Sequence, residues 1–271
     1  MDKTIIEFGK RMDQAEDKQV LVDYAKGFKS ILDLGAGTGK ISRDIAEKWN
    51  THVDAVDLQF KDNCQNSDKI TYYSMDINTF LATTKNKYDC IILSAILHEL
   101  SDSYLETMFH HLNRVLLSNC RIIIREPFYD NALGPVLCKD LNKFVELVQN
   151  KLPAGKAIEF AMTKKLHSEK PLDITDMIGI DWINLCFTIS YGEASWEREK
   201  YELRYARLLN WVKEKFNFNN RPFTGFQVLP VLDKTYREHF VNAGIPGEAF
   251  DLIQYTGMLV IVDYSEVDPN E

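Results

Sequence analysis

The feature that most constrains the fold is an apolar run leading directly into three glycines at alternate positions, in the segment ILDLGAGTGK at residues 31–40. A short apolar run is typical of a buried strand. Glycines after such a strand let the backbone turn sharply and approach a ligand closely. A strand followed by this kind of loop predicts a nucleotide-binding α/β unit, and the glycine spacing then indicates the class of ligand.

The spacing disfavours two phosphate-binding loops. A Walker loop would need a glycine where Leu34 stands and a hydroxyl where Ile41 stands. A dinucleotide-binding loop would need its third glycine at Lys40, but that glycine is Gly39. We therefore expect a ligand that requires no phosphate contact from Lys40.

Strands and helices alternate through the first half of the chain. After the strand at 30–34, apolar runs predict strands at 51–58, 69–76, 88–97 and 120–126. Apolar residues at helical spacing predict helices at 40–49 and 102–117. This alternation is typical of parallel strands joined by right-handed crossovers, which form a doubly wound sheet.

The end of the chain returns to strands after a mostly helical stretch. Residues 249–255 and 257–264 are predicted to be two strands with a link so short that they must form an antiparallel hairpin. The expected fold class is α/β: a doubly wound, mostly parallel seven-stranded sheet with a C-terminal antiparallel hairpin and a helical insertion after the fifth strand. The expected parts are an N-terminal helical segment (1–29), the sheet domain (30–126 and 227–271) and the insertion, which we expect to be an acceptor-binding lid (127–226).

The pattern D-x-G-x-G-x-G at 33–39 resembles motif I of the class I, Rossmann-like S-adenosylmethionine (SAM)-dependent methyltransferases. Asp57 ends the second strand about twenty residues beyond the loop, where an acidic residue meets ribose hydroxyls. The expected hairpin is similar to the end of this family's sheet. The resemblance covers 30–126 and 234–264 and implies that SAM is the cofactor.

The resemblance implies a role for several residues around the cofactor. Asp57 would bind both ribose hydroxyls, Asp33 would place negative charge near the cofactor's cations, and Asp76 would accept from the adenine amino group. The full expected set is Asp33, Gly35, Gly37, Gly39, Asp57, Leu58, Asp76, Ile77 and Ser94. Each aspartate also has a simpler interpretation, since Asp commonly caps turns and strand ends.

Methyl transfer requires the acceptor to lie about 3 Å from the methyl carbon. A general base is needed when the acceptor is a hydroxyl or a protonated amine. The candidate catalytic residues are His98, which follows the fourth strand, and Glu126, which ends the fifth. The alternatives are that His98 caps the next helix or packs below the loop, and that Glu126 pairs with Arg125 or another basic group. No metal site is expected, since the five cysteines form no C-x-x-C pair.

The insertion is expected to bind the acceptor. Arg204 and Arg207 lie in a predicted helix and could bind an anionic group through their guanidinium forks. Tyr191 and Glu193 lie just before this helix and complete the candidate substrate-binding set. The alternative is an amphipathic helix whose arginines pair with neighbouring glutamates.

The net charge of −8 disfavours a nucleic-acid partner, because a phosphate backbone attracts basic surfaces. The chain also lacks the [DNS]-P-P-[YF] segment of amino-methylating nucleic-acid enzymes and any Pro-Cys pair. We expect a small-molecule acceptor with an anionic group; the alternatives are an RNA or protein methyltransferase and a non-catalytic SAM-binding regulatory module. No apolar window is long enough for a membrane span, so we expect no membrane partner and a cytoplasmic location.

Overall fold

The computed structural model describes residues 17–60, 64–97, 100–127, 138–151, 186, 223–232, 234–254 and 257–265. The chain divides into two compact units, which are described separately. The sheet unit comprises Asp17–Pro127, Asn210–Leu229 and Met258–Glu271, and the helical unit comprises Met1–Glu16, Phe128–Leu209 and Pro230–Gly257.

A seven-stranded sheet with the order β3-β2-β1-β4-β5-β7-β6 forms the centre of the sheet unit. The strands are β1 (Ser30–Leu34), β2 (His52–Asp57), β3 (Ile70–Ser74), β4 (Tyr88–Ser94), β5 (Leu116–Pro127), β6 (Phe223–Val231) and β7 (Gly257–Tyr264). β1 to β5 pair in parallel, which confirms the predicted α/β sheet. β2 and β3 extend the sheet on one side of β1, and β4 then pairs with the other side of β1. Ligands of doubly wound folds bind at such a switch point, beyond the carboxyl ends of the strands.

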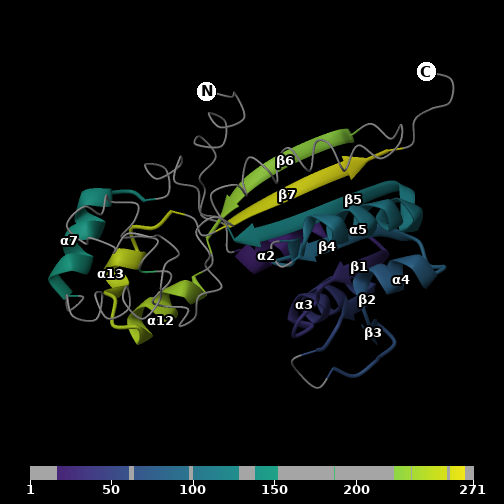
Figure 1. Ribbon diagram of the computed structural model, residues 1–271, viewed down its shortest axis with the longest axis horizontal. Helices are drawn as coiled ribbons and strands as arrows, with labels where there is room; N and C mark the ends of the chain where they lie inside the picture. Colours follow the sequence, from purple (N-terminus) through teal and green to yellow (C-terminus); the bar gives the residue numbers. More distant parts are fainter. Residues whose placement is uncertain are drawn as a thin grey trace. The chain divides into compact units, whose positions relative to one another are not determined.

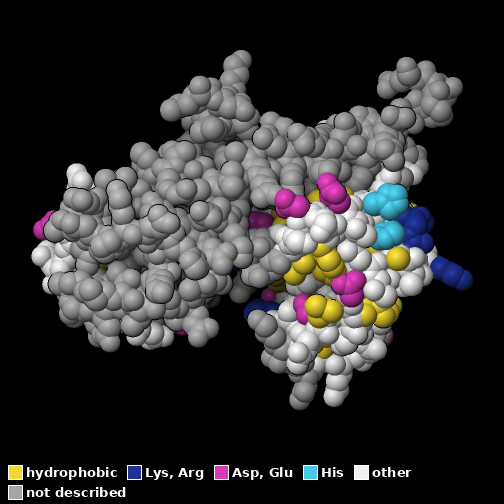
Figure 2. All heavy atoms as spheres, in the orientation of Figure 1, with side chains coloured by type: hydrophobic (Ala, Val, Ile, Leu, Met, Phe, Trp, Pro, Cys, Tyr) yellow, Lys and Arg dark blue, Asp and Glu magenta, His cyan; other side chains and the backbone are white. Residues whose placement is uncertain are grey.

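Four helices complete the described part of this unit: α2 (Asp17–Tyr24), α3 (Lys40–Trp49), α4 (Ile77–Thr83) and α5 (Asp102–Val115). α2 packs on α3, and α4 packs beside α5 (Figure 1). Ser101 caps α5, since its Oγ accepts from the amide of Tyr104, and the predicted apolar face of α5 is buried. His110 and His111 lie at the surface of the same helix, with ring centroids 5.4 Å apart (Figure 2).

The C-terminal strands are antiparallel as predicted, but the predicted partner of the last strand is wrong. β7 runs opposite to β5 and to β6, and β6 is Phe223–Val231 (Figure 1). The expected strand at 249–255 instead begins within helix α13 (Gly247–Phe250), and Ile253 forms an isolated antiparallel bridge with Cys138. β6 contains Pro230, which disfavours a strand in the sequence but is tolerated here because β6 is the edge strand.

An ion pair links the parallel and antiparallel parts of the sheet. Arg121 of β5 donates from Nε and Nη2 to the two carboxylate oxygens of Asp263 in β7, at 2.6 and 3.1 Å. A Cβ on Gly225 of β6 would lie 3.1 Å from the same carboxylate, so the edge strand needs a small residue there. The guanidinium of Arg121 also donates to the carbonyl of Tyr24 at 3.0 Å, which attaches α2 to this end of the sheet.

The helical unit contains α7 (Leu141–Lys151), α12 (Thr235–Asn242) and α13. α13 packs on both of the other helices, and the rings of Phe240 and Phe250 meet edge to face at 5.3 Å. The division places Pro230–Gly257 in this unit, whereas the sequence assigned that segment to the sheet domain. Of the predicted helical insertion the structure describes residues 127, 138–151, 186 and 223–226. The last four already belong to strand β6, and the insertion as a whole stays a prediction. No helix in the described ranges is long and apolar enough to cross a bilayer.

Candidate functional site

The glycine loop, residues 35–39, leaves β1 at the point where the strand order switches. The amides of Gly35 and Ala36 donate to the carbonyl of Val56 at 2.8 and 3.1 Å, which fixes the loop on the end of β2. Its three glycines have φ angles of 74°, 57° and 68°, a left-handed conformation that side chains disfavour. Lys40 lies in α3 and pairs with Asp44 at 2.6 Å, consistent with its exclusion as a phosphate ligand.

Asp57 connects the glycine loop to the turn after β2. Its Oδ2 accepts from the amide of Gly37 at 2.8 Å, and its Oδ1 accepts from the amide of Gln59 at 3.0 Å. Each carboxylate oxygen can accept a second hydrogen bond. The side chain can therefore shape the loop and bind two neighbouring hydroxyls of a ligand at the same time.

Asp33 is buried in β1, and one of its two carboxylate oxygens has a hydrogen-bond partner among the described residues. It is 1% exposed, and its Oδ2 accepts from the hydroxyl of Ser42 in α3 at 2.6 Å. Its Oδ1 has no hydrogen-bond partner among the described residues. Burial raises the pKa of Asp33 to about 6, although the Ser42 hydrogen bond lowers it, and the nearby Asp57 adds to the rise. A buried oxygen without a partner, on a group that can carry negative charge, fits a cationic ligand.

Each glycine of the loop meets a different environment. A Cβ on Gly35 would lie 2.7 Å from the side chain of Ile96, and a Cβ on Gly39 would lie 2.8 Å from Tyr72. A Cβ on Gly37 would meet nothing within 4 Å. Packing thus requires glycine at Gly35 and Gly39, while Gly37 faces open space beside Asp57. This open side is the space that a bound ribose would need.

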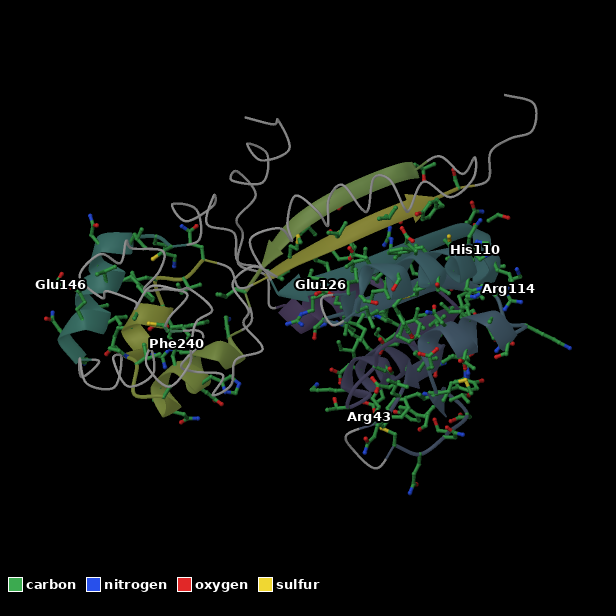
Figure 3. The ribbon with its side chains drawn as sticks, in the orientation of Figure 1. Arg43, His110, Arg114, Glu126, Glu146 and Phe240 are labelled. Atoms are coloured by element: carbon green, nitrogen blue, oxygen red, sulfur yellow. The ribbon has the colours of Figure 1, made fainter. Side chains whose placement is uncertain are left out.

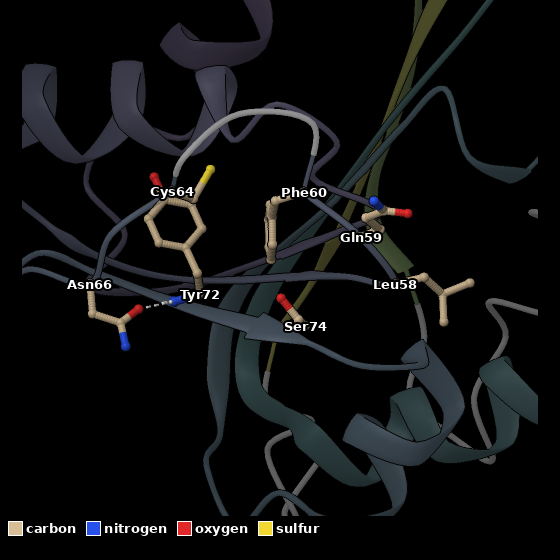
Figure 4. A pocket seen from close by; sticks show the side chains of 7 residues that line it. All are labelled: Leu58, Gln59, Phe60, Cys64, Asn66, Tyr72 and Ser74. Atoms are coloured by element: carbon tan, nitrogen blue, oxygen red, sulfur yellow. Dashed lines mark hydrogen bonds between the residues drawn. The ribbon is translucent and has the colours of Figure 1, made fainter.

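A hollow of about 470 Å³ lies at the carboxyl ends of β2 and β3 (Figure 4). Leu58, the residue after Asp57, lines it and is 73% exposed. Phe60 and Tyr72 meet edge to face at 5.1 Å within its wall, and Asn66 accepts from the amide of Tyr72 at 2.7 Å. An exposed leucine beside this hollow offers an apolar surface to a flat ring.

Asp76 is the N-cap of α4. Its Oδ1 accepts from the amide of Thr79 at 2.9 Å, and its Oδ2 accepts from the hydroxyl of Tyr104 at 2.5 Å. Burial acts to raise the pKa of Asp76, but the hydrogen bonds from Tyr104 and Thr79 outweigh burial and lower it. Ile77 follows as the first residue of α4 and is buried. The cap explains why an acidic residue stands at this position, and contact with adenine stays a prediction.

Beyond β4 lies the post-β4 turn, residues Ala95–Leu97, which follows Ser94. Ala95 has a φ of 55°, and its amide donates to the carbonyl of Arg125 at 2.7 Å. The next two amides donate to one oxygen of Glu126, at 3.0 Å from Ile96 and 2.8 Å from Leu97. Glu126 is 5% exposed and lies near the end of β5 (Figure 3). These contacts suit a residue that shapes the turn better than one that takes a proton from an acceptor.

The described residues bring together most of the predicted cofactor set at the carboxyl edge of the sheet. The candidate base His98 and the candidate acceptor residues Tyr191, Glu193, Arg204 and Arg207 lie outside the described residues.

Three residues that the sequence did not predict contact members of the predicted set: Ser42, Ile96 and Tyr104. Ser42 could have been found from the sequence, because it lies three positions before Ile45 and therefore on the buried face of the same helix. No local pattern predicts the contacts of Ile96 and Tyr104, because their partners lie far away in the sequence.

Comparisons with known proteins agree with this geometry. Residues 31–119 match the family model described as a methyltransferase domain. A search of curated proteins found no match.

Solved structures that resemble the chain include three methyltransferases. Human N-acetylserotonin methyltransferase in complex with SAM is 15% identical over 43% of this chain and 35% of that chain, with a TM-score of 0.37. N-methyltransferase NodS from Bradyrhizobium japonicum WM9 is 10% identical over 98% of each chain, with a TM-score of 0.42. A SAM-dependent methyltransferase from Archaeoglobus fulgidus is 12% identical over 97% of this chain and 100% of that chain, with a TM-score of 0.44. This chain spans about a third of the length of the human enzyme. At such low identities and TM-scores, these structures assign no activity to this chain.

The matched segment begins on β1 and ends within β5, so it takes in the glycine loop, Asp57 and the post-β4 turn. This part of the chain, which carries most of the candidate ligand-binding edge, is therefore similar to a methyltransferase domain.

Proposed function

We propose that the chain transfers the methyl group of SAM to a small-molecule acceptor that carries an anionic group. The observation that carries the cofactor's placement is the junction of the glycine loop with Asp57, where the Gly37 amide and the carboxylate lie 2.8 Å apart beside open space. SAM supplies an electrophilic methyl group on its sulfonium. The residues of this chain bind and orient it.

Each described residue of the site has a role in this proposal. Asp57 binds the ribose hydroxyls with the lone pairs that its backbone contacts leave free. Asp33 places its unpartnered oxygen toward the positive charge of the methionine half. Leu58 and Ile77 flank the adenine, and Asp76 accepts from its amino group. Ser94 begins the segment that lines the methionine half.

The charge distribution along the chain supports a compact acceptor. Residues 127–226 contain fourteen Lys and Arg against thirteen Asp and Glu, while the rest of the chain contains eighteen against twenty-seven. A long polyanion would need a basic stripe, which a near-neutral segment does not provide. Arg204 and Arg207 suit a single carboxylate or phosphate, which a guanidinium binds in a bidentate way. Tyr191 and Glu193 complete the acceptor site, and His98 acts as the base when the acceptor atom carries a proton.

The experiment combines binding with transfer. Calorimetry with S-adenosylhomocysteine tests the cofactor. The protein is then incubated with methyl-labelled SAM and, separately, with a small-molecule extract, total RNA and total protein. We expect the label in the small-molecule fraction. Label in RNA or protein would replace the proposed acceptor class, and binding without any transfer would favour a regulatory module.

A further inference from the structure

The carboxylate of Glu126 binds two consecutive backbone amides. Both bonds go to Oε1, at 3.0 Å from the amide of Ile96 and 2.8 Å from the amide of Leu97. Successive amides that converge on one acceptor oxygen form a concave site. Glu126 thus determines the direction of the post-β4 turn at the edge where the cofactor is proposed to bind.

The same turn packs on the glycine loop. A Cβ on Gly35 would lie 2.7 Å from Cγ1 of Ile96 and 2.9 Å from its Cβ and Cδ1. The side chain of Ile96 therefore occupies the space beside the Cα of Gly35. Any shift of the Ile96 backbone moves that side chain relative to the first glycine of the loop.

We propose that Glu126 is a positioning residue for the cofactor: through the amides of Ile96 and Leu97 it places Ile96 against Gly35, and so fixes the spacing between the two segments that bound the methionine half. This inference rests on the proposed placement of SAM at this edge. It gives Glu126 a different role from the general base considered for it.

The test compares two substitutions of Glu126. Glu126→Gln keeps a carbonyl oxygen at the accepting position, whereas Glu126→Ala leaves both amides without an acceptor. We expect calorimetry to show S-adenosylhomocysteine affinity within about threefold of wild type for Glu126→Gln and at least about tenfold weaker for Glu126→Ala, the size expected when two backbone amides are left without an acceptor. Glu146→Ala, at an exposed glutamate of α7, is the matched control and should leave the affinity unchanged. A loss in Glu126→Gln as large as in Glu126→Ala overturns the proposal, because it means that the charge itself is required.

A second arm measures the amides directly. Hydrogen exchange of the Ile96 and Leu97 amides, followed by NMR, should be slow in wild type and Glu126→Gln and faster in Glu126→Ala. This readout does not depend on the cofactor. If wild type fails to bind S-adenosylhomocysteine but the amides are protected, the proposed function fails and the role of Glu126 in the turn is retained. If Glu126→Ala does not fold, Glu126→Gln still decides between charge and geometry.

A double-mutant cycle tests the relay through Ile96. Ile96→Ala leaves the Glu126 contacts with the backbone and removes the side chain that packs on Gly35. If Glu126 acts through Ile96, each single variant should weaken binding by about tenfold and the double variant by little more, since coupled residues are not additive. An additive loss of about a hundredfold shows that the two residues act independently, and it overturns the relay.

Discussion

The carboxylate of Asp57 accepts a hydrogen bond from the amide of Gly37 at 2.8 Å, and this bond links the two parts of the sequence that predict the cofactor site. One part is the glycine loop after β1, and the other is the acidic end of β2. Because the second carboxylate oxygen accepts from Gln59 at 3.0 Å, the side chain has a fixed orientation before any ligand arrives. A preorganised carboxylate loses little conformational entropy on binding.

Replacing Asp57 should weaken the cofactor site. Asp57→Ala removes the proposed ribose acceptor and leaves the Gly37 amide without its partner. We expect S-adenosylhomocysteine binding to weaken by about 1–3 kcal/mol, as measured by calorimetry. Asp68→Ala, at an exposed aspartate before β3, is the control and should bind as wild type does. Tight binding of NAD by wild type, with no heat from S-adenosylhomocysteine, would contradict the assignment of the cofactor.

The buried Asp33 should make stability depend on pH. Its pKa is about 6 in the folded chain against an ordinary value of 3.8 for an aspartate, so between these values the folded state retains a proton that the unfolded chain releases. The free energy of unfolding should therefore fall as pH rises from about 4 to about 6, by about 3 kcal/mol for this group. Urea unfolding of wild type and Asp33→Asn at a series of pH values isolates this contribution. Between about pH 4 and about pH 6, wild type should lose stability relative to Asp33→Asn. A difference in unfolding free energy that stays constant over this range would contradict the elevated pKa of Asp33.

Gly35 and Gly37 provide a matched pair of substitutions. Both have positive φ, so alanine at either position costs about 1–2 kcal/mol of backbone strain. Gly35→Ala also drives a Cβ into Ile96, for which we expect a further loss of about 1–3 kcal/mol in thermal or urea unfolding. Gly37→Ala meets open space, so it should lower stability less but reduce S-adenosylhomocysteine binding, because its Cβ enters the proposed ribose space. Equal stability losses in the two variants would argue against the contact of Ile96 with Gly35.

The pair Arg121–Asp263 should stabilise the junction of β5 with β7. Its side chains are 24% and 26% exposed, and we expect a coupling of about 1 kcal/mol in a double-mutant cycle with Arg121→Met and Asp263→Asn. Arg237–Asp251 is a matched control, because it has the same two-bond geometry at 2.8 and 3.2 Å but is 49% and 53% exposed. Its coupling should be close to zero. A larger coupling for the control pair would show that burial does not set the contribution of the Arg121 pair.

Methyl transfer to the acceptor should depend only weakly on salt. A single anionic group bound by Arg204 or Arg207 involves few counterions, whereas a polyanion releases many. Initial rates between about 50 and about 200 mM salt measure this dependence. Arg204→Ala and Arg207→Ala should raise the acceptor KM more than the cofactor KM. Activity on total RNA that collapses over this salt range would instead indicate a nucleic-acid substrate.

Several features of this protein could be predicted from the sequence alone. The α/β alternation, the glycine loop and Asp57 are encoded by local patterns: apolar runs, glycines with fixed spacing and an acidic residue at a strand end. Such patterns arise because each element must satisfy its own backbone and bury its own apolar face. These patterns were enough to predict the parallel sheet and the expected position of the cofactor without any tertiary contact.

Other features depended on the tertiary structure. The segment 249–255 is a short apolar run, and a run of this kind does not distinguish a strand from a buried helix. β6 became the edge strand despite Gly225 and Pro230, because pairing with β7 supplies hydrogen bonds that no local pattern records. Glu126 likewise has a partner thirty positions away in the amide of Ile96, at 3.0 Å. The sequence determined which residues could form the site, and the long-range pairing of strands and turns decided which of them meet, since such contacts depend on the fold and not on neighbours in the chain.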